Sequence, residues 1–540
     1  MRPAHDHRPA QRHRCAGLLL ALATSAATGG PAASTPAAPD VQPFGSATVT
    51  VVKPSDIVPP RLLPPCPPGQ CRFAGQTVTM LLPRSVIATP VLEVREEFEA
   101  ATGATLKTVQ VGSMELFDHF YADVTHRTGR YDSFLASAWW LGELVAGDHL
   151  LPYDKYHKDP RFPQWDIEDV LPAPRALLSY GDRKYMVAND HDGQVLYYRR
   201  DLLADAQHKK AFQQKFHYPL QVPRTWQQFR DMAEYFNGQD LNGDGVPDHG
   251  LSLPLKASNQ GMFHFMSLSA SFVIGPSNPR LYWFDPQSMQ PLIESPGHVR
   301  ALQTLVDLVQ FGPREMLGWE PGRSWDHFLA GRAALSFSWG DLGALAQQQG
   351  SQVKGKVGTA ALPGSTEYYS IASGRWMRTE LPNRVGNTTG GSWAGVIAKH
   401  SKAPAATYFL LALLATKDKS MAYAARGSDG IDPGRRYHFL PPDGSARVKA
   451  YLQAGWDEAD VRDYLHAYHD TFSNPLQLPY LRIPGTYSYW QAFNQHLAEA
   501  AAGRVSPQAA LKATALSFEE TTLRLGRDAQ RRAYRASLGL

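Results

Sequence analysis

The sequence predicts an α/β fold with more than one lobe. After residue 75, short segments rich in β-branched and aliphatic residues alternate with segments whose apolar residues recur at helical spacing, which is typical of parallel α/β architecture. The chain has 540 residues, 43% of them hydrophobic, so it can bury a large core, and its size favours at least two lobes over one. Ligands of such folds bind at the carboxyl ends of the strands.

The first α/β units follow one another closely. The expected order is a strand over residues 76–83, a helix within 89–104, a strand over 105–112, a helix over 114–129 and a strand over 131–137. Gly103 and Gly129 are expected to stop the two helices, because glycine ends helices readily.

Later segments predict further helices. The expected ranges are 224–238, 298–312, 406–418 and 506–526. The last of these has Ser506 as its N-cap and Pro507 in its first turn, which are favoured residues at those positions.

Charge and hydropathy argue against a nucleic-acid-binding protein and against a membrane-spanning mature chain. Lys and Arg total 54 and Asp and Glu total 50, a formal net charge of +4, which is too balanced for a nucleic-acid-binding surface. No run of about 18 apolar residues occurs, so no transmembrane segment is expected in the mature chain.

The N-terminus predicts export. Residues 1–30 have an Arg/His-rich start, an apolar stretch from Ala16 to Ala23 and then small residues suited to cleavage, as in a signal peptide. Residues 31–75 are rich in Pro and Ala and are expected to form an extended arm. In this arm Cys66 and Cys71 are five residues apart, which predicts a disulfide in an exported protein; two free thiols are the alternative.

The segment DLNGDGVPDHG, Asp240–Gly250, has the spacing of a calcium-binding loop. Oxygen-bearing residues stand at positions one, three, five and nine, and Gly245 at position six permits the sharp turn. Leu251 takes position twelve, where such loops usually place a glutamate, and a turn that needs no metal is the alternative. The predicted ligands of a structural calcium ion are Asp240, Asn242, Asp244, the carbonyl of Val246, and Asp248.

The motifs of common hydrolases are incomplete. The segment GGSWA, Gly390–Ala394, resembles a nucleophile elbow, but Ala394 replaces the last glycine and no buried strand precedes it. No H-E-x-x-H zinc motif is present. No catalytic residue is therefore predicted, although motifs alone do not exclude a glycosidase, which needs only two suitably placed carboxylates.

Several segments in order carry a family resemblance. They are YDSFLASAWWLGELVAGDHLLPYD, YGDRKYMVANDHDGQVLYYRRDLL, VPRTWQQFRDMAE, FLAGRAALSFSW, VGTAALPG, GGSWAGVIAKHSKAPAATYFLLALLATKD and YSYWQAFNQHLAEAAAGRVSPQAALKAT. Together they resemble the extracellular solute-binding proteins of ABC importers, in the sugar-binding branch that includes the maltose-binding proteins. The resemblance covers about residues 76–526. The chain is longer than ordinary members, with an extra region at 427–470, and some long members carry EF-hand-like calcium loops.

The resemblance implies two lobes joined by crossovers near Asn189 and Gly390. Lobe 1 is expected to comprise residues 76–189 and 391–440, and lobe 2 residues 190–390 and 441–526 with the C-terminal helices; 527–540 would be a tail. A ligand cleft is expected between the lobes.

The same resemblance implies where the ligand is held. Tryptophans that directly follow strands are candidate platforms for a sugar, since aromatic faces supply contact area and polar groups supply orientation. Each of them could instead belong to the core, where large aromatic residues are common. The predicted ligand-binding residues are Trp139, Trp140, Asp192, Trp339, Asp341, Ser392, Trp393 and Tyr487.

The sequence thus predicts a monomeric periplasmic protein that binds a small solute, most simply a sugar or oligosaccharide. It would close its two lobes around the solute and deliver it to the membrane subunits of an ABC permease. A binding module that serves a sensor or an oxidation system is the alternative, and a carbohydrate-active enzyme is the third possibility. Calcium is the one cofactor that the sequence predicts.

Overall fold

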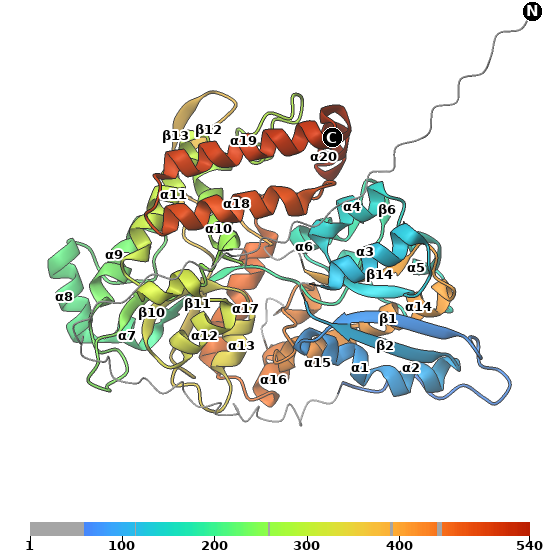
Figure 1. Ribbon diagram of the computed structural model, residues 1–540. Coiled ribbons are helices and arrows are strands. Elements are labelled where there is room, and N and C mark those ends of the chain that lie inside the picture. Colours follow the sequence, from blue (N-terminus) through green and yellow to red (C-terminus); the bar gives the residue numbers. More distant parts are fainter. Residues whose placement is uncertain (1–58, 114, 258–259, 389–391, 440–444) are drawn as a thin grey trace, which may run out of the picture. The chain divides into compact units, whose positions relative to one another are not determined.

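The computed structural model describes residues 59–113, 115–257, 260–388, 392–439 and 445–540, and Figure 1 shows the elements along the chain. Residues 49–540 belong to one compact unit. The predicted signal peptide and most of the predicted arm lie outside the described residues. Within the described ranges, no helix is both long enough and apolar enough to cross a membrane.

The first sheet defines lobe 1. Its strands run in the order β2-β1-β3-β14-β4, and β7 also pairs with β14. Strands β2 and β3 are parallel to β1, as the alternation of strands and helices predicts, whereas β14 runs antiparallel to β3. The strands are β1 (Thr77–Pro83), β2 (Thr105–Val111), β3 (Ser133–Ser137), β4 (Leu150–Leu151), β7 (Val187–Ala188) and β14 (Trp393–Ala398).

The second sheet defines lobe 2, in the order β11-β8-β10-β9. Strands β10 and β11 both run antiparallel to β8, and only β9 is parallel to β10. The prediction of parallel architecture is therefore wrong for this lobe, because the chain enters β8 through a crossover instead of a helix. The strands are β8 (Val195–Arg199), β9 (His249–Leu251), β10 (Ala333–Ser338) and β11 (Val357–Ala360).

Two short antiparallel pairs lie outside these sheets. They are β5 (Ser179–Tyr180) with β6 (Arg183–Lys184), and β12 (Ser365–Ser370) with β13 (Arg375–Asn383).

Helices surround the sheets. In the segments before β8 they are η1 (Val86–Ala88), α1 (Thr89–Glu93), α2 (Arg95–Thr102), α3 (Leu116–His126), η2 (Ala138–Trp140), α4 (Leu141–Ala146), α5 (Asp154–His157), η3 (Ile167–Asp169) and α6 (Pro172–Leu177). Between β8 and β14 they are α7 (Arg200–Ala204), α8 (Ala206–Phe216), α9 (Trp226–Phe236), α10 (Gly261–Val273), α11 (Pro296–Val309), η4 (Arg314–Gly318), α12 (Pro321–Leu329) and α13 (Asp341–Ala346). After β14 they are α14 (Pro404–Leu414), α15 (Lys417–Arg426), η5 (Arg436–His438), α16 (Ser445–Gln453), α17 (Glu458–Ser473), α18 (Thr486–Ala501), α19 (Pro507–Leu525) and α20 (Arg527–Ser537).

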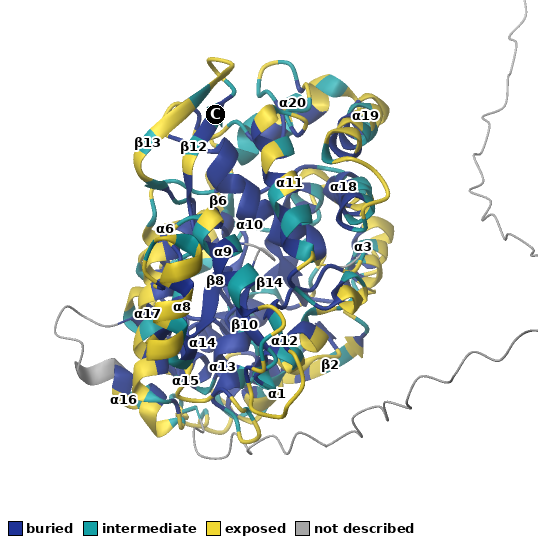
Figure 2. Cartoon of the chain, turned by 90° about the vertical axis from the view of Figure 1, so that its left-hand side faces the viewer, coloured by how far each residue is buried: buried dark blue, intermediate teal, exposed yellow. Residues whose placement is uncertain are grey.

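Local signals place several helix ends where the sequence predicts them, but α3 ends at His126, with Arg127 instead of the predicted Gly129 as its C-cap. Gly103 ends α2 in a left-handed conformation with φ of 73°, which glycine adopts without a steric penalty. Ser506 accepts the backbone N–H of Ala509 at the start of α19, as predicted for an N-cap. Thr225 and Gln228 form a capping box that starts α9. Figure 2 shows that central strands such as β8 are buried, whereas β13 and the outward faces of helices such as α19 are exposed.

The C-terminal segments pack largely on lobe 2. Helix α17 packs on β8 and β11, and α18 and α19 lie side by side against α10 and α11, as Figure 1 shows in red and green. The extra region at 427–470 thus supplies α16 and α17 to this lobe. Residues 527–540, expected as a tail, contain α20, whose Tyr534 is fully buried and which contacts α4.

The described part of the arm, residues 59–75, is anchored on lobe 1. Glu97 Oε1 accepts the backbone N–H groups of Leu62 (2.7 Å) and Leu63 (3.0 Å), while its Oε2 pairs with Lys419 Nζ at 2.6 Å. Both charged side chains are buried, so the arm is tied to α2 and α15 together.

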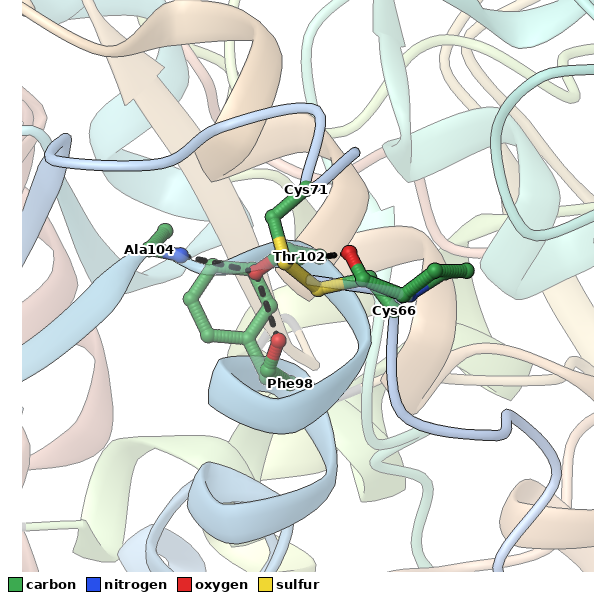
Figure 3. Close-up of a disulfide and its surroundings, with 6 residues drawn as sticks. Cys66, Cys71, Phe98, Thr102 and Ala104 are labelled. Atoms are coloured by element: carbon green, nitrogen blue, oxygen red, sulfur yellow. Dashed lines mark hydrogen bonds between the residues drawn. A yellow bond between two sulfur atoms is a disulfide. The ribbon is translucent and has the colours of Figure 1, made fainter. Parts of the chain in front are cut away.

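A disulfide joins Cys66 and Cys71, with a Cα–Cα distance of 5.2 Å. Figure 3 shows it above the end of α2, next to Phe98 and Thr102. The backbone N–H of Cys66 donates to the carbonyl of Ala100, and a Cβ built on Gly103 would lie 2.6 Å from Cys71 Cβ. The disulfide loop therefore packs closely on the helix end, and glycine at 103 is what leaves room for it.

Candidate functional site

Antiparallel pairing brings residues that are distant in sequence to one place. Trp393 at the start of β14 pairs with Ser137 at the end of β3. In the second sheet Ser338 at the end of β10 pairs with Val195 at the start of β8. The segment after β3 therefore lies next to the segment before β14. In the same way, the segment after β10 lies next to the segment before β8.

The chain crosses between the sheets at this place. The backbone N–H groups of Asn189 and Asp190 donate to the carbonyl of Trp393, which holds the β7–β8 crossover against β14. The N–H of Gln194 donates to the carbonyl of Asn387 in the other crossover. Gly390 itself lies outside the described residues.

A cavity of about 390 Å³ opens beside these crossovers, a volume within the range of small-molecule sites. It is lined by β3 and β14 of the first sheet, by Trp339 just after β10 of the second, and by residues of η2, α3, α10, α12, α13 and α18. The lining residues are Ser113, Phe117, Asp118, Ser137, Trp139, Trp140, Asp192, Gln260, Met262, Phe263, Pro321, Trp325, Trp339, Asp341, Trp393, Tyr487, Trp490, Gln491 and Asn494.

Aromatic rings in contact form a large part of the wall. The ring of Trp139 stacks on Trp490 at 4.7 Å between centroids and lies 5.2 Å from Trp140. Trp140 meets Trp393 edge-on at 6.0 Å. Tyr487, which is half-exposed, stacks on Trp139 at 6.2 Å and lies at the rim.

Trp339 lines the cavity but also belongs to the core of lobe 2. Only 4% of its surface is exposed, and its ring contacts Phe263 at 6.0 Å and His264 at 5.3 Å. Its carbonyl accepts the hydroxyl of Tyr197 at 2.9 Å. Trp339 therefore contributes to the core of lobe 2 as well as to the cavity wall.

Ser392, a predicted ligand-binding residue, is not among the lining residues. It is buried, and its Oγ accepts the backbone N–H of Asp192 at 3.1 Å. Ser392 thus fixes the backbone of a residue that does line the cavity. The other seven predicted ligand-binding residues all line it.

Four carboxylates gather beside the cavity. Asp192 and Asp341 line it, while single oxygens of Asp190, Asp192 and Asp432 lie within 4.8 Å of one another. Asp190 Oδ1 accepts the N–H groups of His191 (2.6 Å) and Asp432 (2.8 Å). Its Oδ2 is buried and has no partner among the described residues.

Asp432 connects this group to lobe 2. Its Oδ2 accepts the backbone N–H of Gly340 (3.0 Å) and the hydroxyl of Tyr468 (2.9 Å), and its Oδ1 accepts the hydroxyl of Tyr464 (3.3 Å). The loop of residues 427–435, which carries Asp432, therefore joins the Asp190 crossover to lobe 2.

Burial and mutual repulsion shift the acidity of all four carboxyl groups. Burial and the Asp341 charge raise the pKa of Asp190 to about 7, and burial raises the pKa of Asp341 to about 6. Burial and the neighbouring carboxylates hold the pKa values of Asp192 and Asp432 well above their usual range. Within the part of the chain that the structure describes, none of the four forms an ion pair with a basic residue.

The predicted calcium loop is a compact turn beside Arg332. Asp240 accepts the backbone N–H groups of Gly243 (2.7 Å) and Gly245 (2.9 Å), and both glycines have positive φ. The guanidinium of Arg332 bonds to Asp244 and lies 3.3 Å from Asp248 Oδ1. These backbone bonds lower the pKa of Asp240, and burial raises the pKa of Asp248. In this arrangement, three carboxylates of the loop do not come close enough together to hold one metal ion. Arg332 supplies the charge that neutralises them.

Some lining residues escape sequence reasoning. Trp490, which the sequence favours as core of the final helical unit, is buried but also lines the cavity. Trp325 on α12 carries no strand-end signal. Asp432 sits in the extra region, and no sequence pattern links it to Asp190.

Two α/β sheets joined by crossovers, with an enclosed solute-sized cavity at the strand ends, define the class of two-lobed periplasmic binding proteins. The sequence matches the model of the bacterial extracellular solute-binding protein family over residues 87–420, which is more than half of the chain. The chain belongs to this family.

Three similar proteins are consistent with this assignment. A solute-binding protein of Agrobacterium radiobacter K84, solved with ribitol, has a TM-score of 0.62 at 18% identity, covering 83% of this chain and 100% of that one. The maltose-bound MalE3 of T. maritima has a TM-score of 0.61 at 19% identity, with the same coverage. A "Probable ABC transporter-binding protein" of Deinococcus radiodurans is 23% identical over 274 residues, 48% of this chain; the match spans 57% of that relative's length.

Proposed function

We propose that the protein captures a carbohydrate, a sugar, oligosaccharide or polyol, and delivers it to an ABC permease. The observation that carries the proposal is the cavity of about 390 Å³ whose wall contains six tryptophans. Aromatic faces suit the C–H faces of sugar rings, and polar side chains on the same wall suit hydroxyl groups. The candidate ligand-binding residues are Trp139, Trp140, Asp192, Trp339, Asp341, Trp393 and Tyr487, with Trp325 and Trp490 added.

The similar structures support this choice of solute. One was solved with ribitol and another with maltose, both of which are polyhydroxylated. Family membership supports export from the cytoplasm and a membrane permease as partner. Export would use the N-terminal signal peptide, and the protein would act in the periplasm as a monomer that binds and does not catalyse.

Capture would proceed by closure of the lobes. The cavity wall combines strand residues of lobe 1 with Trp339 and helix residues of lobe 2, so a solute in it would contact both lobes at once. The crossovers at Asn189 and Asn387 are the connections that would bend, because hinge motion concentrates in a few residues between rigid elements. Binding energy from both lobes would then stabilise the closed form that a permease recognises.

Calcium binding at Asp240–Asp248 also remains our proposal, as a structural role. The side-chain spacing and the positive φ of Gly243 and Gly245 support it. An ion there would take the place of the Arg332 guanidinium, whose bonds to Asp244 and Asp248 now balance the loop. The ligands would be Asp240, Asn242, Asp244, the Val246 carbonyl, and Asp248.

Calorimetric titration of the purified protein with a panel of sugars, oligosaccharides and polyols tests the main proposal. The panel includes ribitol, sorbitol, maltose and cellobiose, with amino acids and organic acids as other classes. Saturable binding of at least one sugar or polyol, with no consumption of it, is expected. Binding confined to amino acids or organic acids, or turnover of a bound oligosaccharide, would contradict it.

A further inference from the structure

The charged residues that line the cavity are all acidic. Asp118, Asp192 and Asp341 line it, and its described lining contains no Lys, Arg or His. Behind the wall stand two more buried carboxylates, Asp190 and Asp432. An anionic solute would meet only like charge here, and such juxtaposition is strongly unfavourable away from water.

The aromatic part of the wall has the same electrostatic preference. The π face of tryptophan is negative, and it attracts cations more strongly than the faces of tyrosine and phenylalanine do. Six tryptophans line a cavity that holds no positive side chain among its described lining. Carboxylates and indole rings thus both favour a positively charged solute.

The carboxylates of Asp190 and Asp432 accept hydrogen bonds, but the group lacks the cationic partners that buried acids normally have. Buried charges in proteins are usually paired, and an unpaired one is costly. The four aspartates repel one another and form no ion pair within the described residues, and the buried Oδ2 of Asp190 accepts no hydrogen bond there. This orphaned oxygen, on a side chain that is 1% exposed, is a second sign that the group is incomplete without a solute.

We propose that the solute carries a protonated nitrogen, as in an aminated sugar or amino-polyol, and that this nitrogen lies between the carboxylates of Asp192 and Asp341. The proposal rests on the carbohydrate function above and narrows it. Asp190 and Asp432 add negative charge from behind, and Trp339 and Trp393 line the same cavity and would contact the rest of the solute. An ammonium group has three N–H donors, which both carboxylates can accept.

Binding of such a cation would release protons. The elevated pKa values of Asp190 and Asp341, about 7 and about 6, mean that these groups are partly protonated near neutral pH. A cation favours their ionised forms and lowers both pKa values. Affinity should therefore fall as the pH is lowered from about 7 to about 5. The groups near them that also titrate or carry charge are Asp192, Asp432, Tyr197, Tyr464, Tyr468, His191 and Arg435.

Matched ligand pairs test the proposal by titration calorimetry. The glucosamine disaccharide with its free amines is compared with cellobiose, and glucamine is compared with sorbitol. Each amine is expected to bind about tenfold or more tighter than its neutral partner. Repeating the glucamine titration in buffers of different ionisation enthalpy should show net proton release, because its aliphatic amine is already protonated at neutral pH, and sorbitol should show none.

Isosteric variants assign the effect to residues. Asp192→Asn and Asp341→Asn are expected to reduce the preference for the amine to about twofold or less, an energy difference too small for an ionic contact. Both variants should keep the melting temperature of the wild type or raise it, because each removes a repelling charge. Asp148→Asn is the control, since that carboxylate is 77% exposed and pairs with Lys399 on the surface.

The outcomes separate the two proposals. If neutral sugars or polyols bind as tightly as their amines without proton release, the inference is wrong and the carbohydrate function stands. If calcium chloride alone raises the melting temperature and Asp192→Asn abolishes that rise, an inorganic cation occupies the place and the inference is also wrong. If no sugar, polyol or amine binds, both proposals fail.

Discussion

Trp393, the first residue of β14, pairs with Ser137, the last residue of β3, and both line the cavity. This register places the Trp393 ring edge-on to Trp140 at 6.0 Å. The positions of Trp393 and Ser137 in the wall are therefore fixed by a strand pair. Substitutions at these positions should change binding more than folding wherever the side chain is not fully packed.

Trp393→Ala tests this directly. Trp393 is only partly buried, so its loss should weaken solute binding by about tenfold, equivalent to about 1.4 kcal/mol, with little change in stability. Trp376→Ala is the matched control, because Trp376 meets Tyr369 edge-on, lies under the Arg300 guanidinium and does not line the cavity. Equal affinities for Trp393→Ala and wild type in calorimetry would remove Trp393 from the site.

Trp339→Ala should instead cost stability as well as binding. Its ring is 4% exposed and packs on Phe263 and His264, and removal of a buried tryptophan typically costs about 3–5 kcal/mol. Trp339→Phe keeps part of the packing and is the cleaner binding variant. Denaturant unfolding measures the first effect, and a Trp339→Ala protein as stable as wild type would show that the ring is not part of the core.

The buried pair of Glu97 and Lys419 should be essential for anchoring the arm. Glu97→Gln leaves Lys419 charged and buried, and breaking such a pair by removing one partner costs about 3–5 kcal/mol. The double variant Glu97→Gln with Lys419→Met should recover part of this loss. A single variant that unfolds at the same denaturant concentration as wild type would contradict the role of this ion pair.

The pH dependence of stability should reveal the raised pKa of Asp341. Its pKa is about 6 in the fold against a usual 3.8, so its ionisation destabilises the folded state. The penalty is absent below the unfolded pKa and grows as the pH rises through the folded one. Asp341→Asn should therefore melt a few degrees above wild type at neutral pH, and the difference should vanish near pH 4. A constant difference at every pH would show that charge is not the cause.

Calcium should raise the melting temperature if the ion displaces Arg332 from the loop. Chelation with EDTA should lower it, and Arg332→Gln should increase the response, because the competing guanidinium is gone. Asp240→Asn should weaken the response. Insensitivity of both wild type and Arg332→Gln to calcium and EDTA would leave the loop as a metal-free turn balanced by Arg332.

The sequence predicts cavity residues correctly where they directly follow a strand. Trp139, Trp140 and Trp339 directly follow apolar strands, so their place at the cavity is readable from local pattern. Trp490 and Trp325 lie on helices. There the sequence pattern of an aromatic residue in the core is the same as that of one that lines a cavity. Asp432 approaches Asp190 only through a long-range backbone hydrogen bond, which no local spacing encodes.

The central claim is that the cavity binds the solute against its tryptophans. Six of the 12 tryptophans of the chain line it, so tryptophan emission should report binding strongly. Titration of a calorimetrically identified solute should give a saturable change in emission with the same dissociation constant, and Trp393→Ala should shift both curves together. A solute that binds by calorimetry yet leaves tryptophan emission unchanged would place its site elsewhere and contradict the account.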